Sequence, residues 1–405
     1  MISFPPPSQC PNCGKTKIYK HQAYTKTVLD LKYNSSGIKR WVIKYLYCRY
    51  RCPACNTVFL ASERPWNRGE KFGENLLAMA IYLNIALRVP QQRVATFFNE
   101  ILGLSFSRAV PNRFKSIVAL YYKPVTEKLM EKIISGGLIH ADETKVNLKG
   151  QLGYVWAFSN LNEVVHLYTP TREGSWVLEL LKEFKGVLVS DFYSVYDSLN
   201  CPQQKCLIHL IHDMNDDLLK EPFNNEMKSL VADFAGLVKP IIETVDRFGL
   251  KARFLRKHKK DVNRFFKSLS QQDFHSDVPA KCKVRLLKNR NQLFTFLDYD
   301  NIPWNNNNAE HAVKAFVYLR RDIRGTSTES GIRDYLILLS LCETCRIKGL
   351  SFLEFLRSGE RDIDAFTKNW LGKSLPKSYR ARGTPLHVGS FFSDWGGAEG
   401  HSCPS

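Results

Sequence analysis

The chain has 405 residues, and its 58 lysines and arginines against 39 acidic residues give a formal net charge of +19. This length allows two to four domains with at least one large core. No apolar run approaches the roughly 18–20 residues of a membrane span, and the first residues lack the basic flank and apolar core of a signal peptide. We expect a soluble, intracellular protein whose positive charge favours a polyanionic partner.

Two cysteine pairs near the start predict a zinc site. Cys10 and Cys13, and again Cys52 and Cys55, share the form Cys-Pro-x-Cys. Each pair places two thiolates on one side of a tight turn, and two pairs complete a tetrahedral site with Zn–S bonds of roughly 2.3 Å. In a reducing compartment, such pairs favour metal binding over disulfides. Residues 1–62 are therefore predicted to form a zinc ribbon with structural Zn²⁺.

The residues between the cysteine pairs predict a β-hairpin. Residues 28–31 and 39–47 have the composition of strands, and residues 34–37 (Asn-Ser-Ser-Gly) form a turn between them. A redox Cys-x-x-Cys pair is the alternative, but two pairs of the same form favour zinc. Cys48 is a competing ligand with poorer spacing.

The next segment, residues 63–135, is predicted to be helical. Apolar residues recur at spacings of three and four over 76–85, Pro90 opens a second helix, and Ser107 can cap a third over 110–122. Two short helices joined by a turn that contains glycine are compatible with helix-turn-helix DNA binding, although ordinary helical hairpins have the same pattern. In the helix-turn-helix interpretation four side chains face DNA: Arg108, Asn112, Arg113 and Lys115.

A run of β-like segments follows. Residues 138–148, 152–159 and 164–169 are separated by connections of hairpin length, which predicts an antiparallel meander. A helix over 175–184 then leads into an apolar strand over 187–190. This βββαβ order matches the start of a ribonuclease-H-like fold, in which the first and fourth strands are neighbours.

Three acidic residues are candidates for catalysis. Asp142 and Asp191 each follow a short apolar run, and Glu310 lies in the first turn of a helix after the asparagines at 305–308. Together they would form a hard-oxygen site suited to Mg²⁺ or Mn²⁺. Each acid alone is more often a turn residue or a helix cap. Glu143 is a rival to Asp142, but strand alternation would point it the other way.

Several segments resemble DDE transposases of the insertion sequence 66 family. They are Asp142-Glu143-Thr144, Asp191 to Tyr196, Cys206 to His209, Asn307 to Glu310, and Leu339 to Gly349. The resemblance covers roughly residues 8–358 and implies that Asp142, Asp191 and Glu310 are catalytic. It departs from the family pattern at residues 210–214, where a basic run is usual, and at His311, where an arginine is usual.

The order of the elements and the resemblance together predict a mixed α/β (α+β) fold. Its parts are the zinc ribbon (1–62), a helix-turn-helix-like domain (63–135), a ribonuclease-H-like core (136–220 and 301–358), a basic α-helical insertion (221–300) and a weakly ordered C-terminal tail (359–405). Within the core, Cys206 and His209 could bind a metal, although a packed cysteine with a hydrogen-bonded histidine is the more common arrangement.

The implied function is metal-dependent cleavage of double-stranded DNA at transposon ends, followed by strand transfer to target DNA. Two Mg²⁺ or Mn²⁺ ions would be held by Asp142, Asp191 and Glu310. The implied setting is the bacterial cytoplasm at the nucleoid, with a homo-oligomer on DNA and accessory transposition proteins as partners. The alternatives are a ribonuclease-H-like nuclease without strand transfer and an inactive, transposase-derived zinc-ribbon DNA-binding protein.

Overall fold

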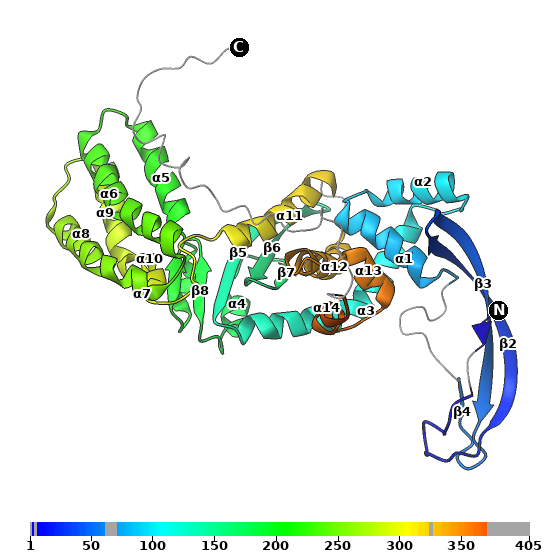
Figure 1. Cartoon of the computed structure of the whole chain (residues 1–405). Helices are drawn as coiled ribbons and strands as arrows, with labels where there is room; N and C mark the ends of the chain where they lie inside the picture. The colour runs from blue at the N-terminus through cyan, green and yellow to red at the C-terminus, as the bar shows by residue number, and fades with distance from the viewer. Residues whose placement is uncertain (1, 4–5, 61–70, 324–326, 371–405) are drawn as a thin grey trace.

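The computed structural model describes residues 2–3, 6–60, 71–323 and 327–370 of the chain. Figure 1 shows an elongated molecule with a long β-hairpin at one end, a mixed α/β body in the centre and a helical body at the other end. The predicted mixed α/β class is confirmed. Within the described ranges, no helix is both long and apolar enough to cross a bilayer.

The N-terminal sheet is built on one long hairpin. Its strands are β1 (Ile2–Ser3), β2 (Tyr19–Asn34), β3 (Gly37–Arg51) and β4 (Val58–Leu60). β2 and β3 are antiparallel, and their turn lies at Asn34–Gly37, as predicted. The strands extend well beyond the predicted 28–31 and 39–47. Residues 19–25 are exposed, so this half of the hairpin lacks the apolar alternation that identifies a strand from sequence.

A buried carboxylate fastens the base of the hairpin to the first helix, α1 (Glu74–Ile81). Asp30 is 2% exposed; one of its oxygens accepts the backbone N–H of Leu76 at 2.9 Å and the other accepts Asn75 Nδ2 at 3.3 Å. Gly73 lies so close to this carboxylate that a Cβ there would stand 2.1 Å from Asp30 Cγ. A side chain at Gly73 would therefore separate the hairpin from α1.

The helical segment contains η1 (Tyr82–Ala86, a π-helical turn), α2 (Gln91–Leu102) and α3 (Ala109–Ile134). The sequence predicts that the third helix ends at residue 122, but α3 continues through Pro124 for three more turns. Proline removes a hydrogen bond from the helix interior. Val125, Leu129 and Ile133 are all buried after the proline, and this packing keeps the helix continuous.

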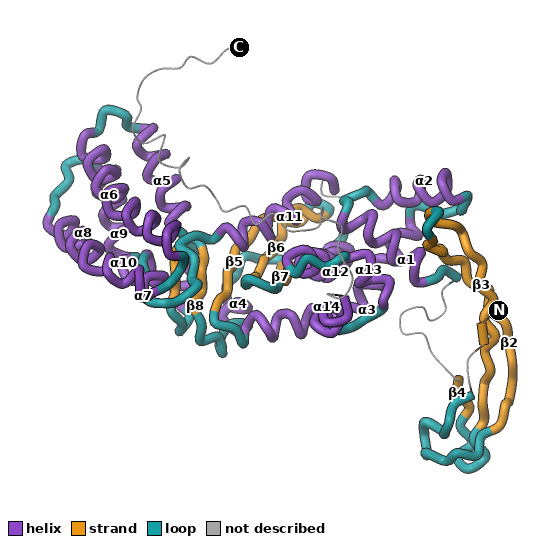
Figure 2. The backbone as a smooth tube through the Cα atoms, viewed as in Figure 1, coloured by secondary structure: helices purple, strands orange, loops and turns teal. Residues whose placement is uncertain are grey.

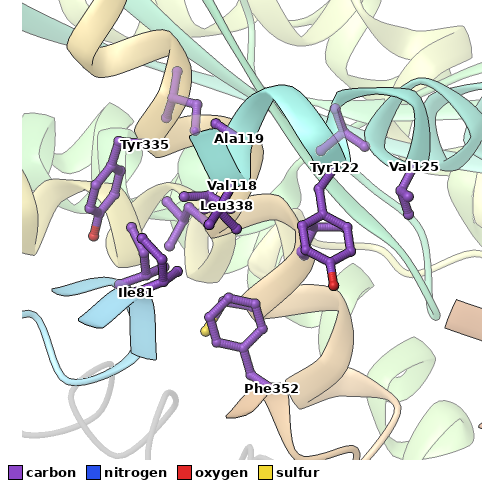
Figure 3. Packing of buried hydrophobic residues seen from close by; sticks show 14 of the residues in the cluster. Ile81, Val118, Ala119, Tyr122, Val125, Tyr335, Leu338 and Phe352 are labelled. Carbon is purple, nitrogen blue, oxygen red and sulfur yellow. The ribbon is translucent and has the colours of Figure 1, made fainter. Parts of the chain in front are cut away.

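One apolar core joins these helices to the central body. Figure 3 shows Ile81 of α1 near Val118 and Tyr122 of α3, together with Leu338 and Phe352 from the C-terminal helices. All five side chains are buried. Burial of a large aliphatic or aromatic side chain contributes roughly 1.5–3 kcal/mol, so this core fixes the helical segment against the sheet.

The central sheet has five strands in the order β7-β6-β5-β8-β9. They are β5 (Leu138–Leu148), β6 (Gln151–Ser159), β7 (Val164–Thr169), β8 (Val187–Ser190) and β9 (Gln203–Lys205). β5, β6 and β7 are antiparallel neighbours, as predicted, and β8 is parallel to β5, with His140 paired to Val189. The predicted neighbourhood of the first and fourth strands is confirmed. The very short β9 was not predicted.

The connections of the sheet bring distant segments against it. α4 (Ser175–Leu180) links β7 to β8 and is shorter than the predicted 175–184, and the 3₁₀ turn η2 (Ser194–Ser198) follows β8. α11 (Asn307–Ile323) packs on β5 and β6, while α12 (Glu329–Ile347) packs on β7 and α3. α11 thus brings its first turn to the strand that carries Asp142.

The third body is helical, as Figures 1 and 2 show beside β8. It contains α5 (Leu207–Lys220), α6 (Asn225–Phe248), α7 (Ala252–Leu255), η3 (Arg256–His258), α8 (Lys259–Gln271), α9 (Asp277–Lys288), α10 (Arg290–Leu293) and η4 (Thr295–Leu297). Leu207 and Leu210 of α5 are buried in its core with Trp304. The predicted limits of 221–300 are therefore too narrow, because α5 packs with the helices that follow it.

The C-terminal helices are α13 (Phe352–Ser358) and α14 (Ile363–Trp370). The sequence assigns residues 359–405 to a weakly ordered tail, and this is wrong for α14. Ile363 and Phe366 are buried in the main core, and Lys132 of α3 forms an ion pair with Asp364. Residues 371–405 lie outside the described residues.

Candidate active site

Asp142 lies in the middle of β5, where it pairs with Ala157 of β6. Burial, followed by the nearby carboxylates of Glu143, Asp191 and Glu310, raises the pKa of this carboxyl to about 7. The three acids that the sequence singled out therefore share one electrostatic environment, although Glu310 is 168 positions from Asp142. Repulsion among carboxylates at one place is relieved by a bound cation.

Asp191 follows β8, which is parallel to β5 and adjacent to it. One of its oxygens accepts the backbone N–H of Tyr193 at 3.0 Å, and the Tyr193 hydroxyl donates to the carbonyl of Arg172 at 2.5 Å. The Arg172 guanidinium lies over the Tyr193 ring, 4.1 Å from its centroid. The loop that carries Asp191 is therefore tied to the segment after β7. The carboxyl end of a parallel strand is a common place for a site.

Glu143 follows Asp142 but has a different environment. Its side chain is only 4% exposed, and Arg172 forms a charged hydrogen bond with it, Nε to Oε1 at 3.0 Å. Burial and the nearby Asp191 raise the pKa of Glu143. Arg172 thus holds both Glu143 and the Asp191 loop, and the sequence pattern gave no indication of this arginine.

Glu310 lies in the first turn of α11. Its backbone N–H donates to the carbonyl of Asn306 at 3.1 Å, and its carboxylate lies 3.9 Å from Lys314 Nζ and 3.9 Å from His209 Nδ1. The carboxylate is one quarter exposed. It can therefore still accept a cation or a substrate group.

Asn306 explains why Glu310 lies close to β5. Its amide nitrogen donates to the carbonyl of Ala141 at 2.8 Å, its amide oxygen accepts from His140 Nδ1 at 3.1 Å, and its backbone N–H donates to Cys206 Sγ at 3.2 Å. Asn306 and His140 are both fully buried, and burial lowers the pKa of His140 to about 4. A neutral imidazole with one N–H donor suits these contacts. Asn306 therefore joins β5, α5 and α11.

The four cysteines of the predicted ribbon lie together. Their sulfur atoms are within 4.8 Å of one another; Cys10 and Cys55 are 3.6 Å apart, and Cys13 and Cys52 are 3.5 Å apart. Four thiolates around one ion at roughly 2.3 Å would stand about 3.8 Å apart. The cluster is thus compatible with zinc binding. Cys48 lies outside this group.

The four residues predicted to face DNA separate into two sets. Arg108, Asn112 and Arg113 are exposed at the start of α3. Lys115 is 5% exposed, and its ammonium donates to the carbonyl of Gly331 at 2.8 Å. The expectation that Lys115 faces DNA is therefore wrong, because α12 covers that side of α3. Burial also lowers the pKa of Lys115 to about 8.

Comparison with known proteins identifies the class of this protein. The family model of the Transposase IS66 family matches residues 69–334, which include all three acids. The chain therefore belongs to the IS66 transposase family, as the motifs indicated, and this membership implies a DNA-processing enzyme of transposition. A protein of Sinorhizobium fredii, the uncharacterized protein y4jD, is 23% identical over 416 residues, covering 94% of this chain and 80% of that protein.

Proposed function

We propose that this protein is a DDE transposase that cuts DNA at the ends of its own element and joins the cut ends to target DNA. The observation that carries the proposal is the shared environment of Asp142, Asp191 and Glu310. These acids come from β5, the end of β8 and the start of α11. Burial and three neighbouring carboxylates raise the pKa of Asp142 to about 7.

The sheet supports a ribonuclease-H-like core. Three antiparallel strands are followed by a helix and by two strands parallel to β5, in the order β7-β6-β5-β8-β9. In such a core the first and fourth strands carry the first two acids of the site. The helical body between α5 and η4 then occupies the place of an insertion before the third acid.

The donor set is composed of carboxylate oxygens, which suits Mg²⁺ or Mn²⁺. Asp142, Asp191 and Glu310 would hold the metal, which in a two-metal arrangement supplies charge stabilisation for the attacking and leaving oxygens of a phosphodiester. Arg172 and Asn306 position these acids by holding the Asp191 loop and the start of α11.

DNA contact is proposed along the basic surface of the helical segment and the ribbon. A cavity of about 460 Å³ lies between α2, α3 and α12, and its lining includes the cationic or polar side chains of Arg88, Arg108, Asn112 and Lys149. Such side chains bind phosphates without reading sequence. The cysteine cluster would hold structural Zn²⁺ and fix the end of the hairpin for the same purpose. A homo-oligomer on two DNA ends, with accessory proteins, is part of this proposal.

The test uses the full chain, DNA that contains the ends flanking its own gene, and Mg²⁺. Nicking and joining are measured separately, and end binding is measured by gel shift. Alanine at Asp142, Asp191 or Glu310 should lower nicking by at least about 100-fold while end binding changes by less than about threefold. The control is Glu179→Ala, because Glu179 is an exposed acid on α4 that forms an ion pair with Lys182.

The outcomes separate the proposal from its alternatives. Nicking without joining would support a nuclease that does not transfer strands. End binding without nicking in any variant, including the wild type, would support a DNA-binding protein that has lost its catalytic activity. Retained nicking by the Asp142→Ala variant would contradict the assignment of the active site.

A further inference from the structure

A second group of metal-ligating side chains lies beside the proposed catalytic acids. Cys206, His209 and Glu310 place one sulfur, one nitrogen and one oxygen within 4.8 Å of one another. Cys206 and His209 come from the start of α5, and Glu310 comes from the first turn of α11. Glu310 is far from the other two residues in the sequence, and Asn306 brings the two helices together.

Cys206 has the environment of a metal-binding thiolate. It is the residue immediately before α5, and its sulfur accepts the backbone N–H of Asn306 at 3.2 Å. Backbone N–H groups of Ile208 and His209 also stabilise its charged form. Without a cation, burial outweighs these donors and keeps the thiol protonated. A metal ion would displace that proton.

His209 supplies the second observation. Its Nδ1 atom is buried and has no hydrogen-bond partner among the described residues, although it lies 3.9 Å from Glu310 Oε1. A buried ring nitrogen without a partner calls for a further group at that place. The side chain as a whole is 41% exposed. The unpaired atom is thus the one that faces the carboxylate.

The spacing and the chemistry agree on the kind of ion. Zinc bonds of about 2.0–2.1 Å to nitrogen and oxygen place two such ligands about 3.4 Å apart at a tetrahedral ion, so the 3.9 Å between His209 Nδ1 and Glu310 Oε1 has to shorten by about 0.5 Å. Thiolate and imidazole donors select Zn²⁺ over Mg²⁺. Three protein ligands leave a fourth position open, as in zinc sites that bind water or substrate.

We propose that Cys206, His209 and Glu310 form a second zinc site, separate from the four-cysteine cluster. Zinc there would link α5 to α11 and hold the Glu310 carboxylate near Asp142. A carboxylate has two oxygens, so Glu310 could also serve the Mg²⁺ site. Only the role of Glu310 in the Mg²⁺ site rests on the proposed function, because zinc binding by Cys206, His209 and Glu310 requires no reaction.

The test counts zinc in the full chain after equilibration with buffered free Zn²⁺. Wild-type protein should hold two zinc ions per chain, and His209→Ala should hold one. His209 is the variant of choice because its partly exposed side chain can be removed without opening the core, and circular dichroism checks the fold. The matched control is His212→Ala, because His212 lies one turn further along α5 and outside the proposed site. This variant should keep two zinc ions per chain.

A second measurement identifies the ligands. Co²⁺ in place of zinc should give two sets of ligand-field bands in the wild type, and only the set of the four-sulfur site in His209→Ala. One zinc ion per wild-type chain, or two in folded His209→Ala, would overturn the inference. If the wild-type chain binds one zinc ion and still cleaves DNA, the second zinc site is overturned and the proposed function stands. If the wild-type chain binds two zinc ions but does not cleave DNA, the proposed function is overturned and the second zinc site stands.

Discussion

Removal of the Asn306 side chain should lower the free energy of unfolding far more than removal of an ordinary asparagine side chain. In Asn306→Ala, the carbonyl of Ala141 loses its 2.8 Å donor and His140 Nδ1 loses its 3.1 Å partner. Ala141, His140 and Asn306 are all fully buried, so water cannot replace these contacts easily. An unsatisfied buried polar group costs about 1–3 kcal/mol. Two such groups predict a loss of about 2–6 kcal/mol in the free energy of unfolding.

The matched control is Asn305→Ala, in the same asparagine run. Asn305 is only half-buried, and its side chain accepts one hydrogen bond, from the backbone N–H of Asn307 at 3.2 Å. Loss of such a capping contact costs about 1 kcal/mol. Guanidinium unfolding followed by circular dichroism compares the two variants. If Asn306→Ala were no more destabilised than Asn305→Ala, the reasoning that Asn306 joins β5 to α11 would be refuted.

Three further predictions concern other parts of the chain. Burial lowers the pKa of His166 to about 4, below its unfolded value of 6.5, so the unfolded chain binds more protons between these values. His166 should contribute a fall of about 3 kcal/mol in the free energy of unfolding from pH 6.5 to 4, beside a similar contribution from His140. His166→Gln should reduce the slope of stability against pH in urea unfolding; an unchanged slope would contradict this. Cys52→Ser should release the ribbon zinc and weaken DNA retention in gel shifts, whereas unchanged zinc content would exclude a Cys₄ site. Arg172→Ala should cost about 1–3 kcal/mol by leaving buried Glu143 without its cation, and should slow nicking more than Arg172→Lys does; equal rates would exclude a positioning role.

The sequence predicted the central sheet well because its signals are local. Short connections at Lys149-Gly150 and at residues 160–162 specify hairpins, and both residues of the first turn have positive φ. The apolar run before Asp191 specifies a buried parallel strand. The order of these elements then places β8 beside β5. The nearness of Asp142 and Asp191 therefore follows from chain order and strand type.

The approach of Glu310 could not be predicted from local pattern. It depends on Asn306, whose side chain contacts residues about 165 positions earlier in the chain. Polarity made the asparagines look like an exposed turn, yet Asn306 is fully buried. The identity of Glu310 came from the motif resemblance, and the structure supplies its physical reason.

Other differences have the same origin in tertiary packing. Lys115 has the charge of a DNA-binding residue, but α12 covers it and Gly331 accepts its hydrogen bond. The predicted third helix ends at residue 122, but burial of the residues after Pro124 keeps α3 continuous. Ile363 and Phe366 are too few to predict a buried helix from sequence, yet they complete the core.

The central claim is that the three acids bind the metal that acts on DNA, and Asp191→Cys tests it most directly. A thiolate at this position binds Mn²⁺ better than Mg²⁺. We predict that wild-type protein nicks transposon-end DNA with either ion. We also predict that Asp191→Cys is at least about 100-fold slower with Mg²⁺ and recovers a large part of this loss with Mn²⁺. Equal nicking by wild type and Asp191→Cys with Mg²⁺ would contradict the claim.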